Sequence, residues 1–218
     1  MISNNASINS KIAIFVAMKN GKVFLLLNGE TPQKIPELSD YEIICATDGA
    51  YHFLKEKMIS PHFISGDFDS LEALPKNIEV IKTPDQNCTD FHKILQILFE
   101  KGFKNIDVYG GSGKEQDHFL GNLHTTIQWK KRLNLTFFDK YGHYFLADKK
   151  IKISNCKDKI ISLVPFPKAT RINTKGLKYT LVNEDLTFGK RIGTRNTAQE
   201  NNIEINFEKG ELFVFVNH

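Results

Sequence analysis

The chain has 218 residues, and this length fits one large or two small domains at roughly 150 residues per domain. Its 41% hydrophobic and 11% aromatic content supplies a packed core and excludes global disorder, and a net charge of +4 without any Lys/Arg block argues against a nucleic-acid partner. No apolar run is long enough to span a membrane, and three widely spaced cysteines without a CxxC pair indicate neither a disulfide framework nor a zinc site. We therefore expect a cytoplasmic protein.

In the first half of the chain, apolar runs typical of buried strands alternate with segments whose apolar residues have helical spacing. Apolar runs predict buried strands at 11–18, 22–28, 42–47, 62–65, 79–82 and 106–109. Helices are predicted at 51–58, at 90–101 between a Thr89 N-cap and a Gly102 stop, and at 118–131. This alternation is typical of a parallel sheet with both faces covered, in which ligands bind at the carboxyl ends of the strands.

The second half changes character after Arg132. Short strand-like runs are expected at 133–139, 144–147, 150–154, 160–164, 179–182, 203–207 and 212–216, separated by turn residues. We therefore predict an α/β fold of two domains. An α/β parallel-sheet domain that binds nucleotide covers residues 1–132, and an all-β sandwich covers residues 133–218.

Acidic residues gather at the predicted strand ends and helix starts: Asp48, Asp67, Asp69, Asp90 and Asp117. Asp67 and Asp69 are two residues apart, so in an extended segment both side chains point to the same side and could hold a hard cation such as Mg²⁺. The presence of each aspartate also has an explanation that needs no function, because Asp favours turns and an acidic residue stabilises the first turn of a helix.

The segment GGSGK at 110–114 is a glycine-rich turn between a strand and a helix. It fails the Walker pattern, since Val108 stands at the first glycine position and Glu115 follows Lys114, and Gln116 breaks the GxGxxG fingerprint. Backbone N–H groups of such a turn, with the Lys114 charge, suit an anion, although a plain flexible turn explains the same residues.

Seven motifs in this order resemble those of the thiamine pyrophosphokinase family over nearly the whole chain. They are NGE at 28–30, DGA at 48–50, GDFDS at 66–70, TPD through TDF at 83–91, the glycine turn leading to DH at 117–118, GLKY at 176–179 and GTRN at 193–196. The resemblance implies a homodimer with thiamine near the interface, and the transfer of a pyrophosphoryl group from ATP to the hydroxyethyl oxygen of thiamine.

The resemblance also implies roles for individual residues. The metal–triphosphate centre, with Mg²⁺ as cofactor, would use Asp67, Asp69 and Asp90, with Asp48 close by as a fourth catalytic carboxylate. The nucleotide would be lined by Asn28, Gly29, Gly110, Gly111 and Ser112, and further binding positions are Gly49, Ser70, Gln86, Thr89, Lys93 and Lys114. Thiamine would contact Asp117, Thr194 and Asn196, beside Arg195.

Two positions depart from the family pattern. Glu115 stands where the family commonly has Arg, and Arg195 replaces the Ser of Gly-Thr-Ser-Asn. We hypothesise that Lys114 or Arg195 supplies the phosphate-binding cation that is missing at position 115.

Two other functions share part of this pattern. A related pyrophosphokinase acting on a pterin-like alcohol would have the same metal–ATP half, but the segments 176–179 and 193–196 favour thiamine. A regulator that binds nucleotide or thiamine without catalysis would not need Asp67, Asp69 and Asp90 together.

Overall fold

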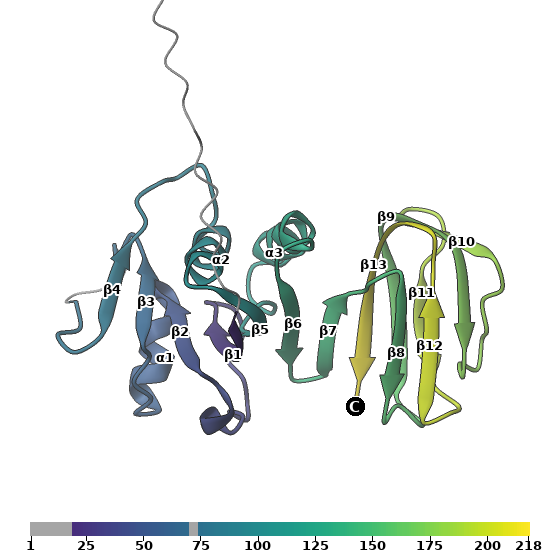
Figure 1. The fold of residues 1–218 in the computed structure, drawn as a ribbon, viewed down its shortest axis with the longest axis horizontal. Helices are drawn as coiled ribbons and strands as arrows, with labels where there is room; N and C mark the ends of the chain where they lie inside the picture. The colour runs from purple at the N-terminus through teal and green to yellow at the C-terminus, as the bar shows by residue number, and fades with distance from the viewer. Residues whose placement is uncertain (1–18, 70–73) are drawn as a thin grey trace, which may run out of the picture.

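The computed structural model describes residues 19–69 and 74–218. Its elements, in chain order, are β1 (Lys19–Leu26), η1 (Leu38–Asp40), β2 (Ile43–Thr47), η2 (Asp48–Ala50), α1 (Tyr51–Glu56), β3 (Phe63–Gly66), β4 (Glu79–Lys82), α2 (Asp90–Glu100), β5 (Phe103–Tyr109), α3 (Gln116–Trp129), β6 (Asn134–Asp139), β7 (Gly142–Leu146), β8 (Lys150–Ser154), β9 (Ile160–Lys175), β10 (Glu184–Thr187), β11 (Gly193–Thr197), β12 (Asn202–Asn206) and β13 (Lys209–Asn217) (Figure 1). None of the helices in these ranges is long and apolar enough to cross a membrane.

The structure is a mixed sheet with few helices. Its strand order is β4-β3-β2-β1-β5-β6-β7-β13-β9-β12-β8, and β10 and β11 pair with β9. Every pairing from β4 to β6 is parallel, whereas β6 with β7 and all later pairs are antiparallel. The helices pack beside the parallel strands. The strands β7–β13, which we call the strand-only part, lie next to them along the long axis of the molecule (Figure 1).

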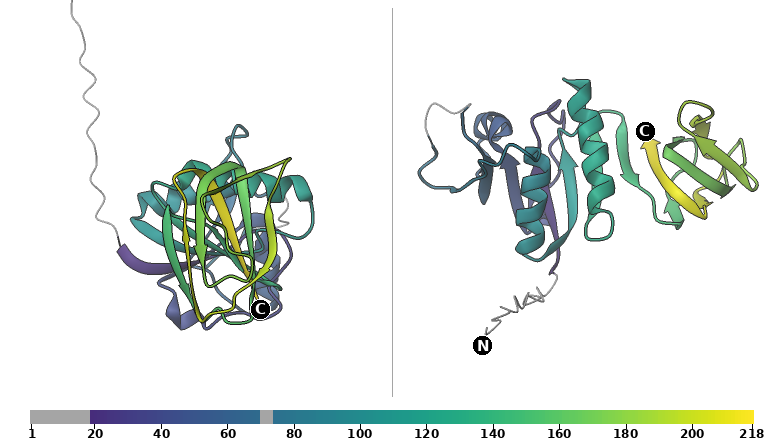
Figure 2. Two further views of the ribbon diagram at one scale, coloured as in Figure 1. Left: turned by 90° about the vertical axis from the view of Figure 1, so that its right-hand side faces the viewer. Right: turned by 90° about the horizontal axis from the view of Figure 1, so that it is seen from above.

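The alternation of side chains along β1 explains why both faces of the parallel strands are covered. Val23 and Leu25 point into the core beneath α2 and α3, whereas Phe24 and Leu26 point into a core that includes Leu54 of α1. The helices α1 and α2 therefore lie on opposite faces of the sheet (Figure 2). The sequences of parallel strands that are buried on both faces are typically continuous apolar runs, and β1 has such a run at 23–26.

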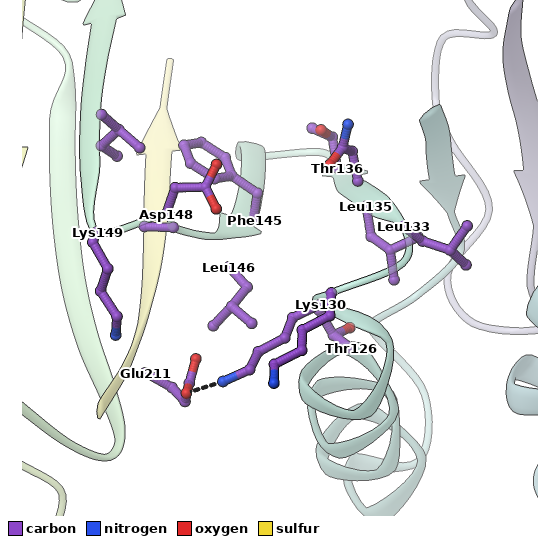
Figure 3. Close-up of a pocket in the computed structure, with 14 residues that line it drawn as sticks. Thr126, Lys130, Leu133, Leu135, Thr136, Phe145, Leu146, Asp148, Lys149 and Glu211 are labelled. Carbon is purple, nitrogen blue, oxygen red and sulfur yellow. Dashed lines mark hydrogen bonds and ion pairs between the residues drawn. The ribbon is translucent and has the colours of Figure 1, made fainter. Parts of the chain in front are cut away.

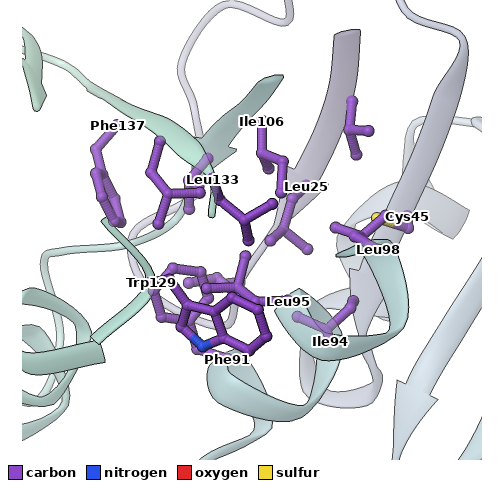
Figure 4. Close-up of a cluster of buried hydrophobic side chains, with 14 of the residues drawn as sticks. Leu25, Cys45, Phe91, Ile94, Leu95, Leu98, Ile106, Trp129, Leu133 and Phe137 are labelled. Carbon is purple, nitrogen blue, oxygen red and sulfur yellow. The ribbon is translucent and has the colours of Figure 1, made fainter. Parts of the chain in front are cut away.

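The helix α2 has the apolar face that its sequence predicts. Phe91, Ile94, Leu95 and Leu98 are all buried under the sheet (Figure 4). The Thr89 hydroxyl accepts a hydrogen bond from the His92 N–H at 3.2 Å, which confirms Thr89 as the N-cap. This cap fixes where the helix starts and therefore where Asp90 lies.

The strand-only part departs from the prediction in three places. Residues 179–182 are not a strand, and β10 and β11 were not predicted because their sequences, EDLT and GTRNT, lack alternating apolar residues. The run at 160–164 is only the start of the sixteen-residue β9. The predicted strand at 11–18 lies outside the described residues.

The all-strand half begins with a strand of the parallel layer. The strand β6 pairs in parallel with β5, so the predicted run at 133–139 extends the first sheet. A third hydrophobic core, which includes Ile161, Leu163, Ile203 and Val214, lies under β9, β12 and β13. The described part of the chain therefore has three hydrophobic cores along one continuous path of strands.

Candidate active site

A pocket of about 550 Å³ opens where the strands β1, β2, β3 and β5 end. It brings together most of the predicted site residues: Asn28, Gly29, Asp48, Gly49, Asp67, Gln86, Thr89, Asp90, Lys93, Gly110, Gly111, Ser112, Lys114 and Asp117. Residues from five separate segments meet there because the carboxyl ends of neighbouring parallel strands share one edge of the sheet.

The buried Asp48 supports the backbone of this edge. One carboxylate oxygen accepts a hydrogen bond from the Gly49 N–H at 2.7 Å, and the other accepts from the Phe68 N–H at 2.8 Å. The side chain thereby joins the end of β2 to the turn that follows β3. Asp48 therefore fixes the position of the neighbouring Asp67.

The segment from Asp67 to Asp69 is a turn, so the condition under which both side chains would point to the same side, an extended segment, is not met. The intervening Phe68 is buried and has φ +67°, in the left-handed region, so the i, i+2 rule for strands does not apply. Asp67 lines the pocket and Asp69 does not. Instead, the Asp69 N–H donates to the Asp67 carboxylate at 3.2 Å.

The Asp67 carboxylate is exposed and favours its charged form. The Asp69 N–H and the Gln86 amide, which lies at 3.4 Å, both donate to it and hold its pKa below the ordinary value. Among residues 19–69 and 74–218, no group of three or more His, Cys, Asp or Glu side chains is arranged to hold a metal ion. Asp67 therefore stands in the pocket as a charged carboxylate without a preformed metal cage around it.

The first turn of α2 contributes one carboxylate and one ammonium group. The Lys93 Nζ lies 2.8 Å from the Asp90 carboxylate and also donates to the carbonyls of Thr83 and Asp85, at 2.9 and 3.0 Å. The Lys93 side chain is only 10% exposed, so these three partners hold it in place. Lys93 therefore joins α2 to the loop after β4 and places a fixed positive charge beside Asp90.

The glycine turn after β5 has its carbonyls occupied. The carbonyls of Gly110, Gly111 and Ser112 accept hydrogen bonds from the Gly29 N–H at 2.8 Å, the Asn122 amide at 2.9 Å and the Glu30 N–H at 2.8 Å. A Cβ on Gly29 would lie 2.2 Å from the Gly110 oxygen, so this close approach requires glycine. The turn is thereby fixed against the end of β1.

The N–H groups of the same turn are free. Within the described part of the chain, no group accepts a hydrogen bond from the N–H of Ser112, Gly113 or Lys114. The Lys114 Nζ donates to the Asn28 side chain at 3.0 Å, and Lys114 itself has φ +114°. Free N–H groups beside an ammonium group make this turn suitable for an anion.

Asp117 lies in the first turn of α3, where its carboxylate accepts from the His118 N–H at 2.9 Å. The pocket is also lined by residues that the sequence did not single out, among them Asn122, Gly121 and Cys88. His118, which belongs to the DH motif at 117–118, lines it as well. No motif marked Asn122, Gly121 or Cys88.

Five predicted positions lie elsewhere or are not described. Asp69, Thr194, Arg195 and Asn196 do not line the pocket, and Ser70 lies outside the described residues. The Asn196 side chain is held at Tyr179, because it accepts from the N–H groups of Tyr179 and Thr197 and donates to the Tyr179 carbonyl at 2.7 Å. It therefore fixes the loop before Tyr179, and β11 lies in the strand-only part (Figure 1).

A second cavity of about 420 Å³ lies between the end of α3 and the strands β7 and β8 (Figure 3). Lys130 and Glu211 form an ion pair across it, and none of the predicted site residues lines it. Most of the residues predicted from the sequence therefore line the pocket at the strand ends, and none lines this second cavity.

Comparison with known proteins identifies matches in both halves of the chain. Residues 36–137 match the family model described as "Thiamin pyrophosphokinase, catalytic domain", and residues 148–212 match "Thiamin pyrophosphokinase, vitamin B1 binding domain". Thiamin pyrophosphokinase 1 of Caenorhabditis elegans is 31% identical over 185 residues, which cover 77% of this chain and 76% of that protein. Thiamine pyrophosphokinase of Bacillus subtilis is 26% identical over 208 residues, covering 88% and 97%.

Solved structures share the fold. The crystal structure of the Bacillus subtilis thiamine pyrophosphokinase superimposes with a TM-score of 0.77 at 24% identity, covering 89% of this chain and 98% of that one. The Candida albicans thiamin pyrophosphokinase gives 0.77 at 18% identity, with 91% and 89% covered. On the evidence of the two family-model matches and the nematode relative, the chain belongs to the thiamine pyrophosphokinase family.

Proposed function

We propose that the protein transfers a pyrophosphoryl group from ATP to the hydroxyethyl oxygen of thiamine, giving thiamine diphosphate and AMP. Membership in the family supports the reaction, and one observation carries its assignment to this pocket. The free N–H groups of the glycine turn and the carboxylates of Asp67 and Asp90 line the same cavity. A polyphosphate needs both features, anion donors and acceptors for its counter-cation.

The donor set of the pocket fits Mg²⁺. Magnesium binds through one or two carboxylates together with waters and substrate phosphates, so it does not require a cage made only of protein ligands. Asp67 and Asp90 would hold the ion, and the Asp69 N–H would support Asp67 by donating a hydrogen bond to its carboxylate. When bound, Mg²⁺ would neutralise charge that develops on the transferring phosphoryl groups.

The residues of the chain have distinct tasks in this proposal. The glycine turn binds phosphate oxygens, Asn28 and Gly29 hold that turn, and Lys93 offsets the charge of Asp90. Lys114 lines the pocket and Arg195 of the same chain does not, which favours Lys114 as the cation that replaces the family arginine at position 115. Asp117 faces the acceptor end, where a carboxylate suits the cationic thiamine.

We extend the proposal to the architecture. Residues 1–132 form the domain that binds nucleotide, residues 133–218 form a β-sandwich that binds thiamine, and β6 of the second joins the sheet of the first. Two copies form a homodimer, and the segment 194–196 of one copy completes the site of the other. Three free cysteines, of which Cys45 and Cys156 are buried, agree with a cytoplasmic location.

The decisive experiment incubates the purified protein with thiamine and Mg-ATP and measures AMP and thiamine diphosphate. We expect both products in equal amounts, and their loss when a chelator removes the metal. Turnover that survives chelation would contradict the metal assignment. Turnover with a pterin-like alcohol but not with thiamine would reassign the acceptor, and binding without turnover would indicate a regulator.

A further inference from the structure

Tyr144 of β7 is fixed in an aromatic stack behind the glycine turn. Its ring lies 4.8 Å from that of Phe137 at an interplanar angle of 6°, and 4.9 Å from that of Phe215 at 23°. Phe119, which lines the pocket, meets the same ring edge-on at 6.1 Å. Only 2% of Tyr144 is exposed, so its ring cannot turn away without disrupting this packing.

The hydroxyl end of this ring faces the turn. A Cβ on Gly111 would lie 2.6 Å from the Phe137 ring and 3.5 Å from the Tyr144 oxygen, so glycine lets the backbone approach the stack. Among the described residues the Tyr144 hydroxyl has no hydrogen-bond partner. Buried hydroxyl groups nearly always have one, which makes this unpartnered group unusual.

Ser112 follows Gly111 directly in the turn that the Tyr144 oxygen faces, so its hydroxyl is a candidate acceptor for the Tyr144 O–H. Burial raises the pKa of the Tyr144 phenol, so the group stays protonated and can donate. The carbonyls of Gly110, Gly111 and Ser112 already have donors, whereas the Ser112 hydroxyl accepts from no described group. A serine hydroxyl can accept one hydrogen bond and donate another at the same time.

We propose that Tyr144 is a positioning residue that acts through Ser112: its hydroxyl donates to the Ser112 oxygen and thereby aims the Ser112 proton at a phosphate oxygen of the bound nucleotide. Tyr144 does not line the pocket, so it has no direct contact with the ligand, whereas Ser112 does line it. A donor that is itself a hydrogen-bond acceptor is polarised and binds an anion more tightly. This inference rests on the proposed function, since it assumes a nucleotide in the pocket.

The test is the variant Tyr144→Phe, which removes one oxygen and keeps the aromatic stack. We expect the Kd for ADP in the presence of magnesium, measured by calorimetry, and the KM for ATP to rise about three- to tenfold. We expect the KM for thiamine to stay unchanged. A matched control is Tyr41→Phe, which removes a hydroxyl that donates to Asp107 at 2.9 Å, away from the pocket, and which should leave both values unchanged.

A double-mutant cycle with Ser112→Ala tests the relay itself. If Tyr144 acts through Ser112, Tyr144→Phe has no further effect on ADP binding once the serine hydroxyl is absent. Additive losses, or a Tyr144→Phe protein that binds ADP like the wild type, would overturn the inference and leave the proposed function intact. Failure of the wild-type protein to form AMP and thiamine diphosphate from thiamine and Mg-ATP would instead contradict the proposed function.

Discussion

Two aspartates that look alike in the sequence have different tasks in the pocket. Both oxygens of Asp48 accept short hydrogen bonds from the backbone, at 2.7 and 2.8 Å, and the side chain is buried. Asp67 accepts longer bonds, at 3.2 and 3.4 Å, and is exposed. The exposed Asp67 carboxylate can therefore bind a cation, whereas both oxygens of the buried Asp48 hold the loop in place.

This difference predicts the effect of replacing Asp67. In Asp67→Asn we expect kcat to fall by about 100-fold or more, because the variant removes a charge that would hold the proposed Mg²⁺. The midpoint of urea unfolding should change little, since the side chain is exposed. Asp69→Asn is the matched control and should lose much less activity, because only the backbone N–H of Asp69 contacts Asp67. Equal losses in the two variants would refute this assignment.

The lowered pKa of Asp67 has a consequence for pH. The Asp69 N–H and the Gln86 amide depress it below 3.8, so the stability that these contacts contribute is present above that value and is lost as the pH falls through the lowered pKa. In Gln86→Leu we expect the pKa of Asp67 to move up towards 3.8. Carbon-13 NMR of the Asp67 carboxyl measures both values. An unchanged pKa in the variant would show that Gln86 does not contact Asp67 in solution.

The two candidate phosphate-binding cations can be separated by which KM they change. Lys114 lines the pocket beside the free N–H groups, so Lys114→Met should raise the KM for ATP about tenfold. In the proposed dimer Arg195 lies on the thiamine side, and Arg195→Ser should change the KM for thiamine rather than that for ATP. Steady-state kinetics with each substrate varied in turn distinguishes the two. The reverse pattern would assign the cation to Arg195.

At the scale of elements, the N-cap of α2 both stabilises the helix and positions two residues of the pocket. The Thr89 cap starts the helix one residue before Asp90 and one turn before Lys93, whose ammonium reaches the loop after β4. A change in the cap is therefore expected to move a carboxylate and its counter-charge together.

The variant Thr89→Ala tests this connection. Loss of the cap should lower the free energy of unfolding by about 1 kcal/mol, measured by urea denaturation, and should also raise the KM for Mg-ATP. Thr89→Ser keeps a hydroxyl at the cap and should restore both properties. A rise in KM that persists in Thr89→Ser would show that the threonine methyl, and not the cap, matters to the site.

The elements differ in how readily the sequence predicts them. The strand at Glu79–Lys82 and the strand at Lys150–Ser154 have the predicted bounds, and α2 has its predicted cap and face. These elements have strong local signals, namely apolar periodicity, caps and turn residues. The strand β11, with the sequence GTRNT, has none and exists because β9 provides a pairing partner.

At the scale of the whole molecule, the fold places the segment 194–196 away from the pocket. Asn196 holds the loop at Tyr179 within the strand-only part, and the pocket lies at the ends of the parallel strands. If both contribute to one reaction, as proposed, they must come from different copies of the chain.

Mixing two inactive variants tests that arrangement. We expect Asp67→Asn and Thr194→Ala dimers to have little activity alone, and activity to return after the subunits exchange, because a mixed dimer contains one site with both intact parts. Activity is measured after brief denaturation and joint refolding, with each variant refolded separately as the control. If all site residues came from one chain, or if the protein were a monomer, no activity would return.

The sequence by itself determined the parallel strands and their helices, the residues at the strand ends and the family, because each depends on local periodicity or on ordered motifs. The tertiary structure decided how those residues are used. It turns the backbone at Phe68, and Asp69 does not line the pocket. It also places the glycine turn so that no group among the described residues accepts from the N–H of Ser112, Gly113 or Lys114. It also brings the hydroxyl of Tyr144 of β7 against Gly111 of that turn. These outcomes depend on contacts between segments far apart in the chain, and no local pattern encodes them.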